Sequence, residues 1–106
     1  MRFEIESSFA ERFARLLPSA PVRQLFLERA ILSRIERALA VARGEIEGPQ
    51  TALVEDGFGL LLTEPGLLGV PELMVAFAYD QPWDPEAVFL IQVRRAEVAD
   101  ETSDMT

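Results

Sequence analysis

The longest regular pattern of apolar and polar positions in the chain predicts a helix over residues 21 to 43. Charged side chains, mainly arginine and glutamate, occupy one helical face of this segment. The opposite face is apolar, with the three- and four-residue spacing of a helix, at Leu25, Ile31, Leu32, Ile35, Ala38, Leu39 and Ala42. An apolar helix face has to be buried against another element, so we expect this helix to pack on a sheet.

A short strand and a shorter helix are predicted before it. Residues 2 to 6 alternate between apolar and charged side chains, as a half-buried strand does. Ser8 and Glu11 have the spacing of a capping box, in which each side chain bonds the other residue's backbone amide. A helix is therefore predicted over residues 9 to 17.

The connection between the two predicted helices is short and rich in proline, at residues 18 to 21. A connection of this length favours two helices packed as an antiparallel hairpin. Ser19 is suited to cap the second helix, and Gly44 is suited to end it.

After Gly44 the spacing changes to that of extended strands. Strands are predicted near residues 58 to 64, 72 to 79 and 87 to 94, and their short connections indicate an antiparallel meander. Residues 51 to 54 are compatible with a further short extended piece.

The predicted fold class is therefore α+β, with the order β-α-α-β-β-β and the helix hairpin packed on one face of the sheet. The second helix should bury Leu32, Ile35 and Leu39 against Val75, Phe77 and Ile91. A chain of 106 residues with 49% hydrophobic residues is enough for one domain, which we place at residues 1 to 95. Residues 96 to 106 are acidic and lack periodicity, which predicts a disordered tail.

The composition excludes several classes of enzyme. The chain contains no histidine, lysine or cysteine. It therefore cannot form a Ser-His or Cys-His nucleophile pair, a Schiff-base lysine, a P-loop lysine or a His/Cys zinc site. We expect a non-catalytic protein without a cofactor or a bound metal.

The charge is unevenly distributed along the chain. Residues 1 to 43 contain eight arginines and five acidic residues, a net charge of +3, whereas residues 44 to 93 contain nine acidic and no basic residues, a net charge of −9. Half of the chain would repel phosphate, so a nucleic-acid partner is not expected. The sequence has no apolar run of membrane-spanning length and no signal-peptide pattern, which predicts a cytoplasmic protein without a membrane partner.

The order of a strand, two helices and a three-stranded meander resembles the RelE/ParE toxin superfamily of bacterial toxin–antitoxin systems. The resemblance extends from Arg2 to Arg95. It includes a first strand, Phe3-Glu4-Ile5, that leads into Ser8-Phe9-Ala10-Glu11-Arg12-Phe13, and a last strand that ends in Val93-Arg94-Arg95. RelE-like ribonucleases place basic and aromatic side chains on the meander and at the C-terminus, where they neutralise a scissile phosphate. Here the matching cations are Arg94 and Arg95 alone.

Four residues form a candidate functional surface: Tyr79, Trp83, Arg94 and Arg95. Tyr79 can instead be a core or rim aromatic, and the two arginines can be a polar strand end paired with a carboxylate. Trp83 is either a lid over the sheet edge or an exposed anchor for a partner.

An acidic cluster falls in the same turn as Trp83. Asp80, Asp84 and Glu86 could hold a hard cation through oxygen ligands, but their spacing matches no calcium loop. A solvated acidic turn explains them equally well.

One layer of helices covers only one face of a sheet, so part of the leucine-rich segment 60 to 70 should stay exposed. We expect Leu61 and Met74 to point away from Leu60 and Leu73. The candidate interface is Leu61, Leu67, Leu68 and Met74.

These patterns predict a small acidic interaction module, a diverged and non-catalytic RelE/ParE-like protein that binds a protein partner or forms a homodimer. The alternative is an active toxin, either a ribosome-dependent mRNA endonuclease or an inhibitor that binds its target. A third possibility is a carboxylate enzyme with a pocket under the loop at residues 82 to 85.

Overall fold

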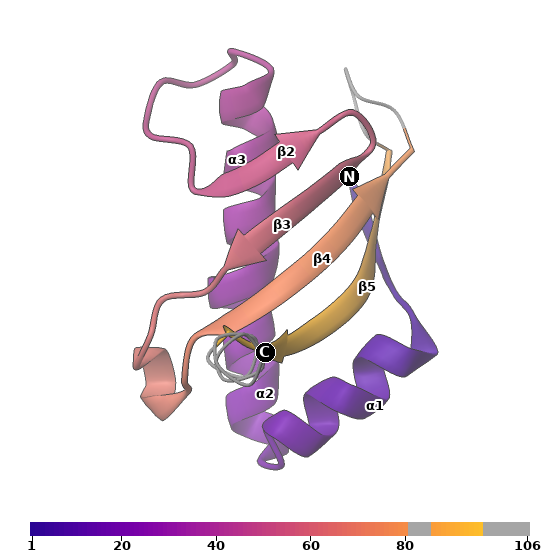
Figure 1. The fold of residues 1–106 in the computed structure, drawn as a ribbon, viewed down its shortest axis with the longest axis vertical. Helices are drawn as coiled ribbons and strands as arrows, with labels where there is room; N and C mark the ends of the chain where they lie inside the picture. The colour runs from indigo at the N-terminus through magenta and orange to yellow at the C-terminus, as the bar shows by residue number, and fades with distance from the viewer. Residues whose placement is uncertain (81–85, 97–106) are drawn as a thin grey trace, which may run out of the picture.

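The computed structural model describes residues 1 to 80 and 86 to 96, which form a five-stranded mixed sheet and two helical segments. In chain order the elements are β1 (Arg2–Ile5), α1 (Ser7–Leu16), α2 (Ala20–Phe26), the π-helical turn η1 (Leu27–Leu32), α3 (Ser33–Ala42), β2 (Ala52–Glu55), β3 (Phe58–Leu62), the 3-10 turn η2 (Leu67–Gly69), β4 (Leu73–Tyr79) and β5 (Ala87–Arg95). The α2, η1 and α3 segments form one long helix, which lies behind the strands in Figure 1. The predicted α+β class is confirmed, and β2 is added to the predicted strands.

The strands lie in the order β1-β5-β4-β3-β2. Strands β2 to β5 form an antiparallel meander, as predicted. Strand β1 pairs with β5 in parallel, from Arg2 opposite Ala87 to Ile5 opposite Leu90. This parallel pairing is possible because the helices and the meander separate the two strands in sequence.

The first helix begins two residues earlier than a capping box formed by Ser8 and Glu11 would place it. Helix α1 starts at Ser7, with Glu6 as the N-cap residue and no side-chain cap hydrogen bond. The first helical hydrogen bond runs from the Ala10 amide to the Glu6 carbonyl (3.0 Å). Ser8 already lies inside the first turn, so the predicted capping box with Glu11 is wrong.

The ends of the long helix agree with the prediction. Ser19 occupies the N-cap position, although its side chain makes no cap hydrogen bond. At the other end Gly44 has a φ of +77°, its amide donates to the Val41 carbonyl, and the Glu45 amide donates to the Ala40 carbonyl, both at 3.0 Å. This pair of bonds is the Schellman arrangement, which favours glycine at this position.

The π-helical turn sets which residues of the long helix face the sheet. Buried residues are four apart from Phe26 to Ala30 and again from Ile31 to Ile35 and Leu39, and Ala30 and Ile31 are buried together within the turn. The extra residue in the turn brings Phe26 onto the same face as Ile35 and Leu39. The sequence pattern missed Phe26, and it assigned to this face Leu25 and Leu32, which are half-buried, and Ala42, which is exposed.

The core lies between the helices and one face of the sheet. Helix α1 contributes Phe9 and Phe13, with ring centroids 5.5 Å apart, and Phe13 packs on Phe26 at 6.3 Å. From the sheet, Val75 and Phe77 are fully buried, as predicted. The predicted core also included Ile91, which is half-buried because a register shift between Ala76 and Phe77 leaves it without a paired residue on β4.

Two side-chain hydrogen bonds join the long helix to β3 and to the segment before β2. Arg34 Nη1 donates to the Leu62 carbonyl at the end of β3 (2.9 Å). Gln50 Nε2 donates to the Ala38 carbonyl (3.2 Å), which holds the segment before β2 against the helix. No helix within the described part of the chain is long and apolar enough to cross a membrane.

Candidate functional site

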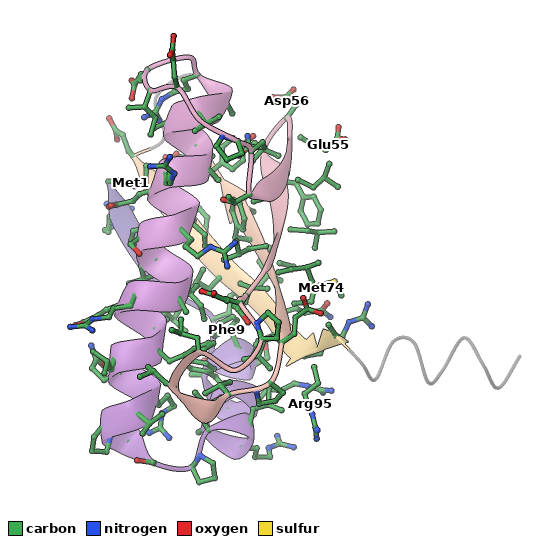
Figure 2. All side chains as sticks on the ribbon, turned by 90° about the vertical axis from the view of Figure 1, so that its left-hand side faces the viewer. Met1, Phe9, Glu55, Asp56, Met74 and Arg95 are labelled. Atoms are coloured by element: carbon green, nitrogen blue, oxygen red, sulfur yellow. The ribbon has the colours of Figure 1, made fainter. Side chains whose placement is uncertain are left out.

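The described helices lie on one side of the sheet, and the other side carries a layer of uncovered side chains. Figure 2 shows the sheet from its edge, with the long helix on one side and Glu55 and Met74 projecting from the other. We call this second side the open face. Its apolar residues, by strand register, are Leu53, Phe58, Leu60, Leu62, Met74, Ala76, Ala78 and Phe89.

The register places these residues in rows across the strands. Leu53 lies opposite Leu60, and Leu60 lies opposite Ala76, so the three share a face. The next row on the same face joins Leu62, Met74 and Arg94. A third row joins Phe58, Ala78 and Phe89, with Glu55 at its end.

Gly59 decides which side chains of β3 point to the open face. A Cβ atom at Gly59 would lie 2.6 Å from Phe77 Cε2 and 2.8 Å from Cε1, so the Phe77 ring occupies the space of the missing side chain. Gly59 is therefore on the helix side, and alternation puts Leu61 on that side as well. Leu61 points away from Leu60, as predicted, but it is fully buried, so its predicted place in the exposed interface is wrong.

The other predicted interface residues are not grouped together. Met74 is half-buried on the open face, opposite Leu62. Leu67 packs against the core, and Leu68 is exposed on the connection between β3 and β4. Among the four predicted residues, Met74 alone belongs to the open face.

Three large side chains on the open face are exposed and were not predicted as interface residues. Leu53 is 57% exposed, Leu62 is 48% exposed and Phe58 is 41% exposed. Leu53, Leu60, Leu62 and Met74 line a shallow hollow of about 420 Å³ at the β2 side of the face. Strand β3 is apolar at both alternating positions, so the hydrophobic pattern does not show which of its side chains face the helices. Gly59 is the sequence feature that indicates this, because a strand glycine marks a close approach by another group.

The predicted functional surface is divided between distant places. Tyr79 is buried on the helix side, and its hydroxyl donates to the backbone carbonyl of Glu55. Arg94 and Arg95 lie at the opposite end of the sheet, beside Met74 and Leu73. Tyr79 lies six residues along β4 from Leu73, which is a distance of about 20 Å. Tyr79 therefore has a structural role, and Trp83 lies outside the described residues.

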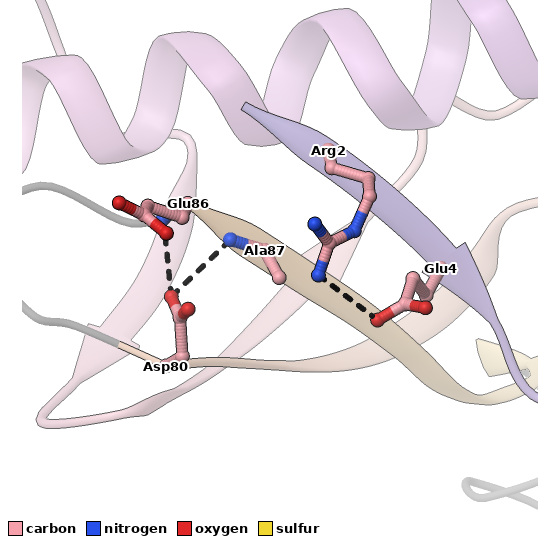
Figure 3. Close-up of polar contacts among 5 residues, drawn as sticks. All are labelled: Arg2, Glu4, Asp80, Glu86 and Ala87. Carbon is pink, nitrogen blue, oxygen red and sulfur yellow. Dashed lines mark hydrogen bonds and ion pairs between the residues drawn. The ribbon is translucent and has the colours of Figure 1, made fainter.

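Asp80 holds the beginning of β5. Its Oδ1 accepts hydrogen bonds from the backbone amides of Glu86 (3.1 Å) and Ala87 (3.2 Å), as Figure 3 shows. Asp84, the third member of the predicted acidic cluster, lies outside the described residues. In residues 1 to 80 and 86 to 96, no group of three or more acidic, histidine or cysteine side chains could hold a metal ion.

The charged residues around the open face differ between its two sides. Glu55 and Asp56 are exposed at the β2 side. On the β5 side, Arg94 and Gln92 line a small hollow of about 170 Å³ together with Arg12 from α1. At the β1 edge, Arg2 and Glu4 form an exposed ion pair (3.6 Å, Figure 3). The face therefore has an apolar centre, with acidic residues at the β2 side and with Arg94 and the Arg2–Glu4 ion pair at the side of β5 and β1.

Comparison of the chain with protein-family models, with curated proteins and with solved structures finds no match in any of the three. The structure shows an α+β fold of two helical segments and a mixed five-stranded sheet over the described residues. Function therefore has to be inferred from the chemistry of the open face.

Proposed function

We propose that this protein is a non-catalytic interaction module that binds a protein partner through the open face. The observation that supports this proposal is the set of apolar residues on the side of the sheet opposite the helices, where Leu53, Phe58 and Leu62 are exposed together. Apolar surface in water is unfavourable, and contiguous patches of it mark binding sites. We further propose that the protein is a diverged RelE/ParE-like protein that acts in the cytoplasm.

The chemistry of the face favours a protein partner. The rows of Leu53, Leu60 and Leu62 are apolar on β2, β3 and β4, and they end on β5 in Gln92 and Arg94. A partner surface rich in leucine or aromatic side chains would bury these groups. Residues 44 to 93 supply β2, β3 and β4 and carry a net charge of −9, which disfavours nucleic acid.

Replacing Leu62 with glutamate should strongly weaken partner binding. The side chain is 48% exposed at the edge of the hollow, so a carboxylate there stays hydrated in the free protein and has to be desolvated in a complex. We expect at least a tenfold loss of affinity for the partner, whether another protein or an untagged copy of the chain. The measurement is co-purification from source cells, followed by titration of the purified partner.

Ile46→Glu is the matched control. Ile46 is 40% exposed in the loop between α3 and β2, away from the open face, so this substitution adds the same charge at a similarly exposed apolar site. It should leave the partner bound. Retention of the same partner by the Leu62→Glu variant, with both variants folded, would contradict the proposal.

A second candidate is an active toxin of the RelE/ParE type, either a ribosome-dependent mRNA endonuclease or a target-binding inhibitor. It is favoured by Arg12, Gln92 and Arg94, which come together from α1 and β5 although the sequence separates them widely. Such a group could contact a phosphate. The net charge of −9 on residues 44 to 93 opposes this use.

We expect no specific mRNA cleavage by this protein in a translation assay with ribosomes. The basic group is small, and few phosphates could be neutralised by a chain whose residues 44 to 93 carry a net charge of −9. Sequence-specific cuts that disappear in an Arg12→Ala, Arg94→Ala double variant would replace the interaction module by the toxin.

A further inference from the structure

We propose that the occupant of the open face is a second copy of this chain, packed face to face with its strands crossed at about a right angle. This inference rests on the proposed function and names its partner. Sheets pack face to face in aligned or orthogonal arrangements, and the charges on the face select between them.

Glu55 and Arg94 mark opposite corners of the apolar surface. Glu55 on β2 and Arg94 on β5 are three strand spacings apart, about 14 Å. The row of Glu55 contains Phe89, and Arg94 lies two open-face rows beyond that row, which adds about 13 Å along the strands. The two corners are therefore about 20 Å apart on a diagonal at about 45° to the strands.

A two-fold axis between two facing copies has to lie in the plane of the interface. An axis along the strands would place Glu55 over Phe89 of the second copy, and an axis across the strands would place Arg94 over Phe89. An axis along the diagonal from Glu55 to Arg94 would place each charge over its own copy. The fourth choice is an axis perpendicular to the line from Glu55 to Arg94. It places Glu55 of each copy over Arg94 of the other copy, which gives two ion pairs, and it crosses the strands of the two copies at about 90°.

The same axis also matches the apolar side chains. It passes close to Phe89, so this ring meets its own copy at the axis. Leu53 lies over Leu62 of the second copy, and the small Ala76 lies over Leu60, which lets the side chains interdigitate. One placement therefore pairs Glu55 with Arg94 across the interface and buries the exposed leucine and phenylalanine residues together, while Arg2 and Glu4 keep their ion pair within each copy.

Single cysteines test the position of the axis, because the chain has no cysteine of its own. In the crossed dimer, Phe89→Cys brings two thiols together at the axis. Leu53→Cys is the control on the same face: Leu53 is more exposed, but it lies about 10 Å from its own copy. Under mild oxidation of the purified full chain, we expect the residue-89 variant to form a covalent dimer at least tenfold faster than the residue-53 variant.

Charge exchange tests the pairing at the corners. Glu55→Arg and Arg94→Glu should each weaken dimerisation roughly tenfold, because two attractive contacts become repulsive. The double variant, with both charges exchanged, should restore the wild-type dissociation constant to within about threefold. Sedimentation equilibrium over a concentration series measures all four proteins.

Three results would overturn this inference: a monomeric wild-type protein at every concentration, faster cross-linking through residue 53 than through residue 89, or a double variant no better than the single ones. If the purified protein is monomeric but binds a different cellular protein, and the Leu62→Glu variant loses that protein, the self-pairing is wrong and the proposed function stands. Faster cross-linking through residue 89, together with dimerisation restored in the double variant, would support both the crossed dimer and the proposed function.

Discussion

Replacing Gly59 with alanine is expected to destabilise the protein by about 3 kcal/mol, although it adds a single methyl group. The new Cβ would lie 2.6 Å from Phe77 Cε2, well inside van der Waals contact. Phe77 is fully buried beneath the long helix, so its ring cannot move aside without disturbing the core. The methyl group therefore forces the strand or the ring out of position, and urea unfolding measures the loss.

Two further variants separate this clash from other effects of losing a glycine. Gly44→Ala places a methyl group where no atom lies within 4 Å, and its φ of +77° should cost only about 1 kcal/mol. Phe77→Leu in the Gly59→Ala background should cost less than the sum of the single changes, because the smaller side chain makes room. Strictly additive losses would show that Phe77 does not fill the site of the glycine.

Replacing Phe26 with alanine should destabilise the protein by about 3–5 kcal/mol. Phe26 has no exposed surface and packs against Phe13, where the long helix meets α1. Truncation leaves a cavity between two helices that are both fixed to the sheet, so the site cannot easily collapse. Chemical denaturation of the purified variant gives the free energy of unfolding.

Phe58→Ala deletes the same side chain from the open face and is the control. Phe58 is 41% exposed, so its removal should cost about 1 kcal/mol or less in the free protein. Equal losses at the two positions would contradict the assignment of Phe26 to the core and of Phe58 to the open face.

Local periodicity was enough to predict most of the fold. The alternation of Leu73, Val75, Phe77 and Tyr79 identified β4 and its buried side. The segment that forms β2 has only four residues, and its pairing with β3 depends on contacts along the whole edge, so the sequence indicated no more than an extended piece.

The errors in the core have two local causes. The π-helical turn changes the spacing within the long helix, so an ideal helical period selected Leu25 and missed Phe26. The register shift opposite Ile91 similarly breaks the alternation in β5. Both are single-residue insertions that a fixed period cannot represent.

The candidate site was harder to predict than the fold. The element order predicts that one layer of helices leaves one sheet face uncovered. The identity of the leucines on that face depends on the pairing of Gly59 with Phe77. Tyr79 and Arg94 were grouped by residue type alone, and the length of β4 holds them at opposite ends of the sheet. Residue chemistry without strand register could not separate them.

Site-specific photo-cross-linking in source cells tests most directly whether the open face binds a protein. A photoreactive amino acid is placed at residue 62 in one variant and at residue 46 in another, since both native side chains are exposed but only Leu62 lies on the open face. We predict one discrete protein adduct at residue 62, formed with a second copy or another protein, and none at residue 46. Equal labelling at the two positions, or an adduct at residue 46 alone, would contradict the proposed function.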